Sequence, residues 1–573
     1  MEGNFLRRHT MRHDFPFPPL SYPRPLLWRD SFFSLDGEWE LAFSADAKEP
    51  AVFPLRVTVP FPVESALSGI GRGPGAGEFL YYRKRFSLPE GFCLATTVLH
   101  FTAVDQACEV FLNGMSLGCH TGGYLPFSFD VTALLKEENV LTLRVSDTLD
   151  LSLPYGKQRK KRGGMWYTPF SGIWGSVWLE SFPENGIHGV TVVGDDKSVR
   201  LSVDAESPVT LSYTDGEEEK TVCFEKTITI TPSHPHPWSP DDPYLYHVIL
   251  KTKDDQARTY FALRKLEAKE INGKSRLALN GKPIFLHGIL DQGYFADGIS
   301  TPATPEEYEK DILRMKSLGF NMLRKHIKVE SQVYYSLCDR HGMVVCQDAV
   351  NNGRYSFLWQ TALPTVGMKR LPSFLLFKSK KAKEIFAAHT EETVEHLVSH
   401  PSLLLFTIFN EGWGQSDPMP LYESLKAKYP HLLLDSASGW FRTPHTDFRS
   451  DHVYFKPVRP RYGKVAKPVF LSEFGGYSLP VPGHKFPSGK NYGYTVCASR
   501  EELARRLTEL YIKEVCPAIE KGLSLAVYTQ LSDVEDETNG LYTYDREVQK
   551  VETEVMLSIK KELDGALAAA VKE

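Results

Sequence analysis

Long hydrophobic runs and an apolar leader are both missing from this sequence of 573 residues. The longest apolar runs, such as residues 403–409, are far shorter than the roughly 20 residues that a membrane-spanning helix needs. The first residues, MEGNFLRRHTMRHDFPFPPL, contain early prolines and no hydrophobic core of the signal-peptide type. We therefore expect a cytoplasmic protein without a membrane partner.

Paired cysteines, metal-ligand spacings and charge bias are also scarce. The eight cysteines form no C-x-x-C pair, which favours buried free thiols over a disulfide framework. The histidines have no zinc-ligand spacing, and no glycine-rich phosphate loop occurs, so that we expect neither a metal nor a cofactor. A net charge of −5 gives no reason to expect nucleic acid as a partner.

Short strands separated by turns are what the first half of the chain contains instead. Segments such as YYRKRFSL alternate in polarity, and Asn113-Gly114 has the composition of a two-residue hairpin turn. A second and shorter β region follows, with segments such as KTITITP and YLYHVILKT. Because neither region contains a convincing helical pattern, we expect an antiparallel β-sandwich over residues 1–185 and an immunoglobulin-like sandwich over 186–272.

The character of the sequence changes after about residue 275, where apolar runs alternate with amphipathic segments. Thr304-Pro305-Glu306-Glu307 is typical of a capping box and predicts a helix to Leu318, and two further helices are predicted over 379–400 and 499–521. Eight repeated strand–helix units in about 290 residues predict a (β/α)8 TIM barrel over residues 273–573. The strand candidates are 284–290, 320–326, 343–348, 403–411, 432–436, 452–455, 469–473 and 523–531.

Two of these strand candidates end in a glutamate. Glu411 follows the run SLLLFTIFN, and Glu473 lies in KPVFLSEFGG. The chemistry of such barrels takes place at the C-terminal ends of the strands, where the two acids can face each other. Carboxyl groups about 5–5.5 Å apart suit a retaining glycosidase. Taken alone, either acid also fits a structural ion pair with an arginine of the barrel.

The combination resembles glycoside hydrolase family 2. The motifs that carry the resemblance span most of the chain: WYTPFSGIWGSVWLE, WSPDDPYLY, LGFNMLRKH, Asn-Glu after one apolar strand and Ser-Glu-Phe-Gly after another. The resemblance implies that the first sandwich is a sugar-binding-type jelly roll and that the barrel is catalytic. It also implies that Glu411 is the acid/base, Glu473 the nucleophile and Asn410 the amide that holds the sugar 2-hydroxyl.

Other strand ends supply further candidates by the same resemblance. Arg324 matches the arginine that keeps the nucleophile ionised, with barrel packing as the alternative. The family often has a histidine three residues after this arginine, whereas this chain has His326 two residues after it. His452 and Tyr454 match a His-x-Tyr motif in which the tyrosine hydroxyl orients the nucleophile.

Four more residues are candidates for substrate contact. Asp291 stands where many β-galactosidases of the family have Arg-His or Asn-His, and a carboxylate there can accept hydrogen bonds from sugar hydroxyls. Asp348 either does the same or pairs with an arginine. Trp440 forms a stacking wall or a buried aromatic contact. Gln530 lies near the end of strand eight, where many relatives carry a tryptophan.

The basic run KQRKKRGG at residues 157–164 has two interpretations. It is short and flanked by β sequence, which is typical of a solvated loop, but it can also lean toward the barrel mouth and help to bind an acidic sugar. The Asn-x-Lys element that grips the uronate in β-glucuronidases of the family is absent after strand eight. Other basic residues predicted in or near the mouth are Lys325, Lys328, Arg354, Arg449 and Lys456.

These patterns predict a retaining exo-β-glycosidase of the β-galactosidase-like kind, acting on a small glycoside or oligosaccharide. A β-hexuronidase that uses basic mouth residues is the alternative within the enzyme class. A non-catalytic carbohydrate-binding protein is the third hypothesis, which the presence of both strand-end acids disfavours. Self-association of many relatives suggests a homo-oligomer.

Overall fold

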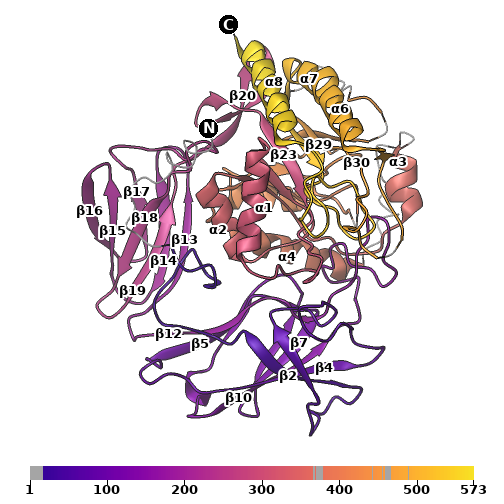
Figure 1. The fold of residues 1–573 in the computed structure, drawn as a ribbon. Helices are drawn as coiled ribbons and strands as arrows, with labels where there is room; N and C mark the ends of the chain where they lie inside the picture. Colours follow the sequence, from indigo (N-terminus) through magenta and orange to yellow (C-terminus); the bar gives the residue numbers. More distant parts are fainter. Residues whose placement is uncertain are drawn as a thin grey trace.

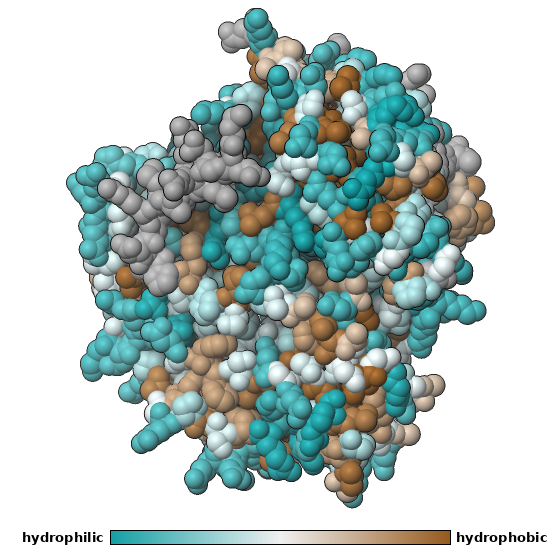
Figure 2. All heavy atoms as spheres, viewed as in Figure 1, coloured by the Kyte–Doolittle hydropathy of each residue, from teal (hydrophilic) through white to brown (hydrophobic). Residues whose placement is uncertain are grey.

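The computed structural model describes residues 17–572, apart from 366–367, 369–378, 414, 442, 455, 459–465 and 488. Two β-sandwiches precede a (β/α)8 barrel in the chain, as the sequence predicts. In Figure 1 the first sandwich lies below the barrel and the second lies to its left. The face shown in Figure 2 carries hydrophilic residues over both sandwiches and over the barrel helices, with hydrophobic residues between them.

The first sandwich packs a four-stranded sheet (order β1-β12-β5-β9) and a six-stranded sheet (order β3-β2-β4-β10-β7-β8) around one apolar core. The predicted turn joins β7 to β8, with Asn113 at φ +54° and Gly114 at φ +82°. A short pair, β6 and β11, completes this part. The strands are β1 Phe32–Ser34, β2 Gly37–Ser44, β3 Leu55–Val59, β4 Phe79–Phe86, β5 Thr96–Phe101, β6 Val104–Asp105, β7 Ala107–Leu112, β8 Met115–Thr121, β9 Phe127–Asp130, β10 Asn139–Ser146, β11 Gly172–Ile173 and β12 Val177–Phe182.

The second sandwich pairs a three-stranded sheet (β13-β14-β17) with a four-stranded sheet (β16-β15-β18-β19). A buried aspartate ties it to the barrel, because Asp339 Oδ2 accepts a hydrogen bond from Tyr260 at 2.7 Å and Asp339 Oδ1 accepts one from Ser402 N at 2.8 Å. The strands are β13 Ile187–Gly194, β14 Val199–Ala205, β15 Val209–Asp215, β16 Glu218–Phe224, β17 Thr227–Ile230, β18 Tyr246–Lys251 and β19 Gln256–Phe261.

A three-stranded sheet leads from the second sandwich into the barrel: β20 Leu266–Ile271, β21 Lys274–Leu279 and β22 Lys282–Pro283. Leu277 and Leu279 share one apolar core with residues near the beginnings of the barrel strands, such as Leu286. Arg276 donates hydrogen bonds to the carbonyls of Ile519 (2.7 Å) and Glu520 (3.1 Å). This sheet therefore covers the end of the barrel opposite the strand C-termini.

The barrel strands are parallel and follow the order β27-β26-β25-β24-β23-β32-β29-β28 among the described residues. All eight predicted strands are present, although the fourth ends at Thr407, four residues before its predicted end, and the sixth begins at Arg449, three residues before its predicted start. Residue 455, the predicted end of the sixth strand, lies outside the described residues. Most positions in these strands are buried, which is why each appears in the sequence as a nearly continuous apolar run. Their bounds are β23 Leu286–Asp291, β24 Met322–Lys325, β25 Val344–Asp348, β26 Leu403–Thr407, β27 Leu433–Asp435, β28 Arg449–Val453, β29 Val469–Gly475 and β32 Leu523–Thr529.

Helices surround the strands, and three of the described helices begin at serine caps. Ser331 Oγ accepts a hydrogen bond from Val333 N. Ser379 Oγ accepts a hydrogen bond from Ala382 N, and Ser499 Oγ accepts one from Glu502 N. None of the described helices is long and apolar enough to cross a membrane. The principal helices are α1 Glu306–Ser317, α2 Gln332–His341, α4 Lys380–Leu397, α5 Met419–Lys428, α6 Arg500–Leu510, α7 Cys516–Glu520 and α8 Thr553–Val571.

Two helix predictions are wrong in detail. No side chain caps α1, because the Thr304 hydroxyl is engaged by the Glu306 carboxylate, a hydrogen bond that lowers the pKa of Glu306. The helix predicted over 499–521 is also not continuous, since a π-turn at Tyr511–Val515 separates α6 from α7. Pro517 lacks a backbone N–H, and the wider turn accommodates its place early in α7.

Candidate active site

The backbone after β26 holds Glu411 at the barrel mouth. Glu411 N donates a hydrogen bond to Ser438 O at 3.0 Å, and Ser438 N donates one to Phe409 O at 2.8 Å. Glu411 has φ +50°, a left-handed conformation that few residues other than glycine adopt. Its side chain is nevertheless buried, with 7% of the residue exposed. Such strained positions are concentrated at functional sites.

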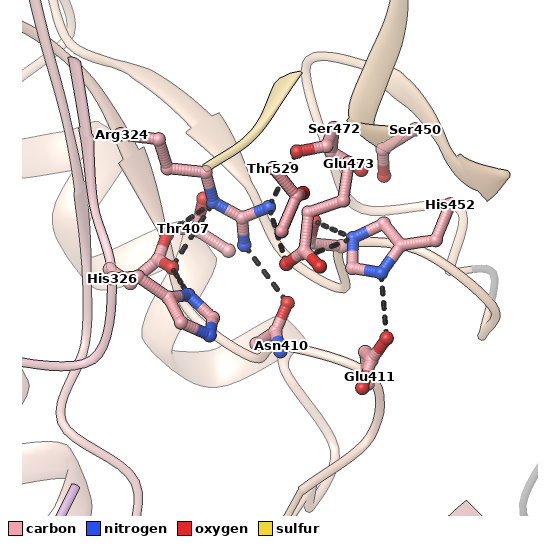
Figure 3. Close-up of polar contacts among 12 residues, drawn as sticks. Arg324, His326, Thr407, Asn410, Glu411, Ser450, His452, Ser472, Glu473 and Thr529 are labelled. Atoms are coloured by element: carbon pink, nitrogen blue, oxygen red, sulfur yellow. Dashed lines mark hydrogen bonds and ion pairs between the residues drawn. The ribbon is translucent and has the colours of Figure 1, made fainter. Parts of the chain in front are cut away.

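Glu411 and Glu473 meet across the pocket. Glu473 lies in β29 and is 5% exposed, and one carboxylate oxygen of each glutamate lies within 4.8 Å of the other. His452 in β28 lies between them, with Nδ1 2.9 Å from Glu411 Oε1 and Nε2 3.6 Å from Glu473 Oε1 (Figure 3). A contact of this length between the nearest oxygens is compatible with the separation of about 5–5.5 Å between the carboxyl groups of retaining glycosidases.

Arg324 at the end of β24 joins the nucleophile candidate to the amide. Its Nη1 donates to Glu473 Oε1 at 3.2 Å and to Ser472 O at 2.8 Å, and its Nη2 donates to Asn410 Oδ1 at 2.9 Å (Figure 3). Because the oxygen of Asn410 is bound in this way, its NH2 group remains as the donor for a substrate.

The electrostatic environment gives the two glutamates different pKa values. Burial raises the pKa of Glu411 above its usual value, and the hydrogen bond with His452 offsets this only in part. Burial also acts on Glu473, but the nearby His452 and Arg324 more than offset it and hold the pKa of Glu473 well below its usual range. Tyr454 adds a hydrogen bond from its hydroxyl to Glu473 Oε2. Glu411 therefore keeps its proton to a higher pH than Glu473 does.

Asp348 binds the side chains of both Arg324 and His326. Its Oδ1 accepts a hydrogen bond from Arg324 Nε at 3.0 Å, and its Oδ2 lies 2.6 Å from His326 Nδ1. Of the two interpretations of Asp348, the arginine pair is the one that the structure contains. Burial lowers the pKa of His326 to about 4, so that its ring is neutral near pH 7.

The remaining candidates lie at different distances from the pair. Trp440 is half-buried, and its ring centroid lies 6.1 Å from that of His452. Asp291 is bound by Lys325 at 2.7 Å and by Gly293 N at 2.8 Å, within a separate buried cluster. Gln530 donates to Glu537 Oε2 at 2.8 Å and so contacts the pocket through a second acid. Their contacts with substrate stay predictions.

The basic loop, residues 157–164, reaches the barrel mouth. Residues 159–162 are exposed, as a solvated loop predicts, but that interpretation is wrong for Lys157, which is 5% exposed. Lys157 Nζ lies 4.8 Å from the ring centroid of Trp413. The interpretation in which the basic loop reaches the mouth includes Lys157, whereas Trp413 is not among the predicted site residues, since its contact with Lys157 depends on how the sandwich packs on the barrel. The tryptophan two residues after Glu411 is the signal that the sequence offered.

Glu537 is a second residue that sequence reasoning missed. It lies in the loop after β32, is 5% exposed, and accepts hydrogen bonds from Tyr167 and Gln530, each at 2.8 Å. Burial raises the pKa of its carboxyl group. The acidic run DVEDE, which ends at Glu537, was the available signal.

Two groups of described side chains have a spacing that can hold a metal ion. The first is Glu411, His452 and Glu473, and the second is the more exposed set of His484, Asp545 and Glu547. In the first group, Arg324 and Tyr454 also bind Glu473. This donor set fits an acid–nucleophile pair at least as well as a cation.

Two close carboxylates at the ends of strands four and seven, in a barrel preceded by two sandwiches, define a glycoside hydrolase architecture. Family models agree along the chain: a glycosyl hydrolase 2 galactose-binding domain-like model matches residues 77–173, a glycosyl hydrolases family 2 model matches 187–264, and the TIM barrel domain of that family matches 270–485. The chain belongs to glycoside hydrolase family 2.

Curated relatives are more distant. A β-galactosidase from Thermoanaerobacter pseudethanolicus is 27% identical over 297 residues, which cover 47% of this chain and 39% of that protein. A β-galactosidase from Aeromonas hydrophila is 26% identical over 454 residues, covering 72% of this chain and 41% of that protein. The chain thus spans about two fifths of the length of these relatives.

Solved structures share the fold over nearly the whole chain. The β-D-glucuronidase of Dictyoglomus thermophilum has a TM-score of 0.71 at 18% identity, covering 93% of this chain and 97% of that one. A β-galacturonidase from Eisenbergiella tayi has a TM-score of 0.67 at 16% identity, covering 93% and 96%. At these identities the likeness concerns the three-part fold.

Proposed function

We propose that this chain is a retaining exo-β-glycosidase that hydrolyses terminal β-linked sugars in small glycosides or short oligosaccharides. The observation that carries the proposal is the spacing of Glu411 and Glu473, whose nearest carboxylate oxygens lie within 4.8 Å. The opposite pKa shifts of the two acids support it, because the double-displacement reaction needs one proton donor and one ionised nucleophile.

In the first half of the reaction, Glu473 attacks the anomeric carbon while Glu411 donates its proton to the leaving oxygen. The aglycone departs as an alcohol, and the sugar remains as an ester of Glu473. In the second half, Glu411 accepts a proton from water, the resulting hydroxide attacks the anomeric carbon, and the ester bond to Glu473 breaks. Two inversions restore the β configuration.

Neighbouring side chains position the reacting groups. Arg324 and Tyr454 bind the two oxygens of Glu473 and keep it ionised and oriented. The free NH2 group of Asn410 suits the sugar 2-hydroxyl, a contact that strengthens in the transition state. Lys157 lies 4.8 Å from the ring centroid of Trp413, two residues after Glu411, so that both side chains are near the proposed acid.

Curated relatives named β-galactosidase support a neutral hexoside as substrate. A β-hexuronidase is the second candidate, because Lys157 is a buried ammonium beside the catalytic pair. A cytoplasmic location and a homo-oligomer also stay proposals. The free state of all eight cysteines, three of which are exposed, supports a reducing compartment.

Nitrophenyl β-glycosides provide the test. We expect Glu473→Ala to abolish turnover and Glu411→Gln to slow hydrolysis most for poor leaving groups, because those need the proton most. Glu38→Ala, at an exposed position of the first sandwich, is the matched control and should retain full activity. Normal turnover by Glu473→Ala, or no hydrolysis of any glycoside by the natural chain, would contradict the proposed function.

A further inference from the structure

Two charged side chains border the pocket without serving the catalytic pair. Lys157 comes from the first sandwich and Glu537 from the loop after β32. Tyr167 lies between them: Lys157 Nζ is 5.7 Å from its ring centroid, and its hydroxyl donates to Glu537 Oε2 at 2.8 Å. The ammonium of Lys157 and the carboxylate of Glu537 thus lie near the same tyrosine, although they come from different domains.

The ammonium group of Lys157 retains hydrogen-bond donors that no described residue uses. Its Nζ forms no hydrogen bond and no ion pair of 4 Å or less with any residue that the structure describes, although Glu537, Glu473 and Glu411 are its principal charged neighbours. Burying an ammonium without such a partner is costly, and burial lowers the pKa of Lys157. We infer that the ammonium of Lys157 donates hydrogen bonds to a bound ligand.

Glu537 has a matching free acceptor. Both of its hydrogen bonds, from Tyr167 and Gln530, go to Oε2, and Oε1 receives none from the described part of the chain. Those two donors fix the plane of the carboxylate. Oε1 is therefore an oriented acceptor in the same part of the pocket as the ammonium of Lys157.

We propose that Lys157 and Glu537 bind neighbouring hydroxyl groups of a neutral sugar and that this pair selects neutral β-glycosides over β-hexuronides. The inference rests on the proposed function. Glu411 and Glu473 fix the anomeric carbon between them, so that side chains of the pocket that bind neither carboxylate face the rest of the ring.

The chemistry of the pair fits hydroxyl groups best. A hydroxyl can accept a hydrogen bond from Lys157 and donate its own proton to Glu537. An ionised carboxylate at C6 has no proton to donate, and it would bring a second negative charge beside Glu537. A single ammonium beside Glu537 offers a uronate one positive and one negative neighbour, whereas both side chains can bind a neutral hydroxyl.

Three other basic residues of the mouth are already occupied. Lys325 and Lys328 both bind Glu330 Oε1, at 3.0 and 2.7 Å, and Arg324 is shared among Asp348, Glu473 and Asn410. None of these three cations is available to assist Lys157 in gripping a substrate carboxylate.

The test compares kcat/KM for nitrophenyl β-galactoside and β-glucoside with that for nitrophenyl β-glucuronide and β-galacturonide. The natural chain should prefer at least one neutral sugar. Lys157→Met and Glu537→Gln should each lower kcat/KM for that sugar by roughly 10–100-fold, because each removes a charged hydrogen-bond partner. Glu537→Gln should also shift the ratio toward uronides, since it removes the repelling charge.

Lys160→Met, in the exposed part of the basic loop, and Glu547→Gln, at an exposed carboxylate, are the controls and should leave both rates unchanged. Thermal unfolding of Lys157→Met and Glu537→Gln separates lost binding from lost folding. Two results overturn this inference alone. The first is turnover that depends on Glu473 and favours a uronide, and the second is full activity on neutral sugars in folded Lys157→Met and Glu537→Gln. Absence of turnover with any nitrophenyl β-glycoside, mannosides included, instead contradicts the proposed function.

Discussion

Arg324 shows at the scale of single residues how the pocket gives its two acids different roles. Its guanidinium binds Glu473 and the oxygen of Asn410 while Asp348 holds it from behind. Glu411 has no arginine contact in the described part of the chain, and burial dominates its environment. The same barrel mouth therefore favours the ionised form of one glutamate and the protonated form of the other.

These pKa shifts predict a bell-shaped pH profile for kcat/KM. Activity should fall as the pH drops through the lowered pKa of Glu473, because the nucleophile becomes protonated. It should also fall as the pH rises through the raised pKa of Glu411, because the proton donor is lost. Glu411→Gln, assayed with the same nitrophenyl glycoside, should be slower and should lack the alkaline limb. An unchanged alkaline limb in that variant would show that another group donates the proton.

The strand-end pattern sufficed to predict that Glu411, Glu473 and Asn410 lie close together, because a barrel brings the ends of its strands together whatever its loops do. It could not predict Lys157 or Glu537. Each lies in a long connection outside a barrel strand, and each is buried only because the first sandwich packs against the barrel mouth.

At the scale of elements, the end of β29 depends on a close contact behind the nucleophile candidate. Gly475 has φ +83°, and a Cβ atom at this position would lie 2.3 Å from Cε2 of Tyr528. The tyrosine belongs to the neighbouring strand β32 and is fully buried. The packing of these two strands therefore fixes the path of the chain just after Glu473.

Gly475→Ala should displace this strand end, lower the free energy of unfolding by about 1–3 kcal/mol and reduce kcat at least about tenfold. Gly565→Ala is the matched control, since no heavy atom lies within 4 Å of its added Cβ in α8, and it should stabilise the chain by up to about 1 kcal/mol. Thermal unfolding measures the stability of the two variants, and nitrophenyl glycoside hydrolysis measures their kcat. Equal effects of the two substitutions would refute the packing argument.

The strand predictions were confirmed where burial determines the structure. The predicted helix cap was wrong where a side chain competes with the backbone for the same hydrogen bond. The barrel strands are apolar along most of their length, which leaves a strong pattern in the sequence. The helix start at Thr304 has the composition of a capping box, but its hydroxyl binds the Glu306 side chain instead of the backbone. Composition alone does not rank such alternatives.

At the scale of the whole molecule, the pocket is assembled from two of the three parts of the chain. The barrel supplies Glu411, Glu473 and Arg324, and the first sandwich supplies Lys157 and Tyr167. The second sandwich contributes through its anchor at Asp339, which holds it against α2. The first sandwich is therefore part of the active site in this account.

The most direct test of the proposed chemistry is to identify the residue that becomes glycosylated during turnover. A 2-deoxy-2-fluoro β-glycoside with a good leaving group slows release of the intermediate, and peptide mass spectrometry then locates the bound sugar. We expect one sugar per chain, attached to Glu473, with Glu473→Ala unlabelled. A sugar on a different residue, or hydrolysis that never forms a covalent intermediate, would contradict the assignment of Glu411 and Glu473.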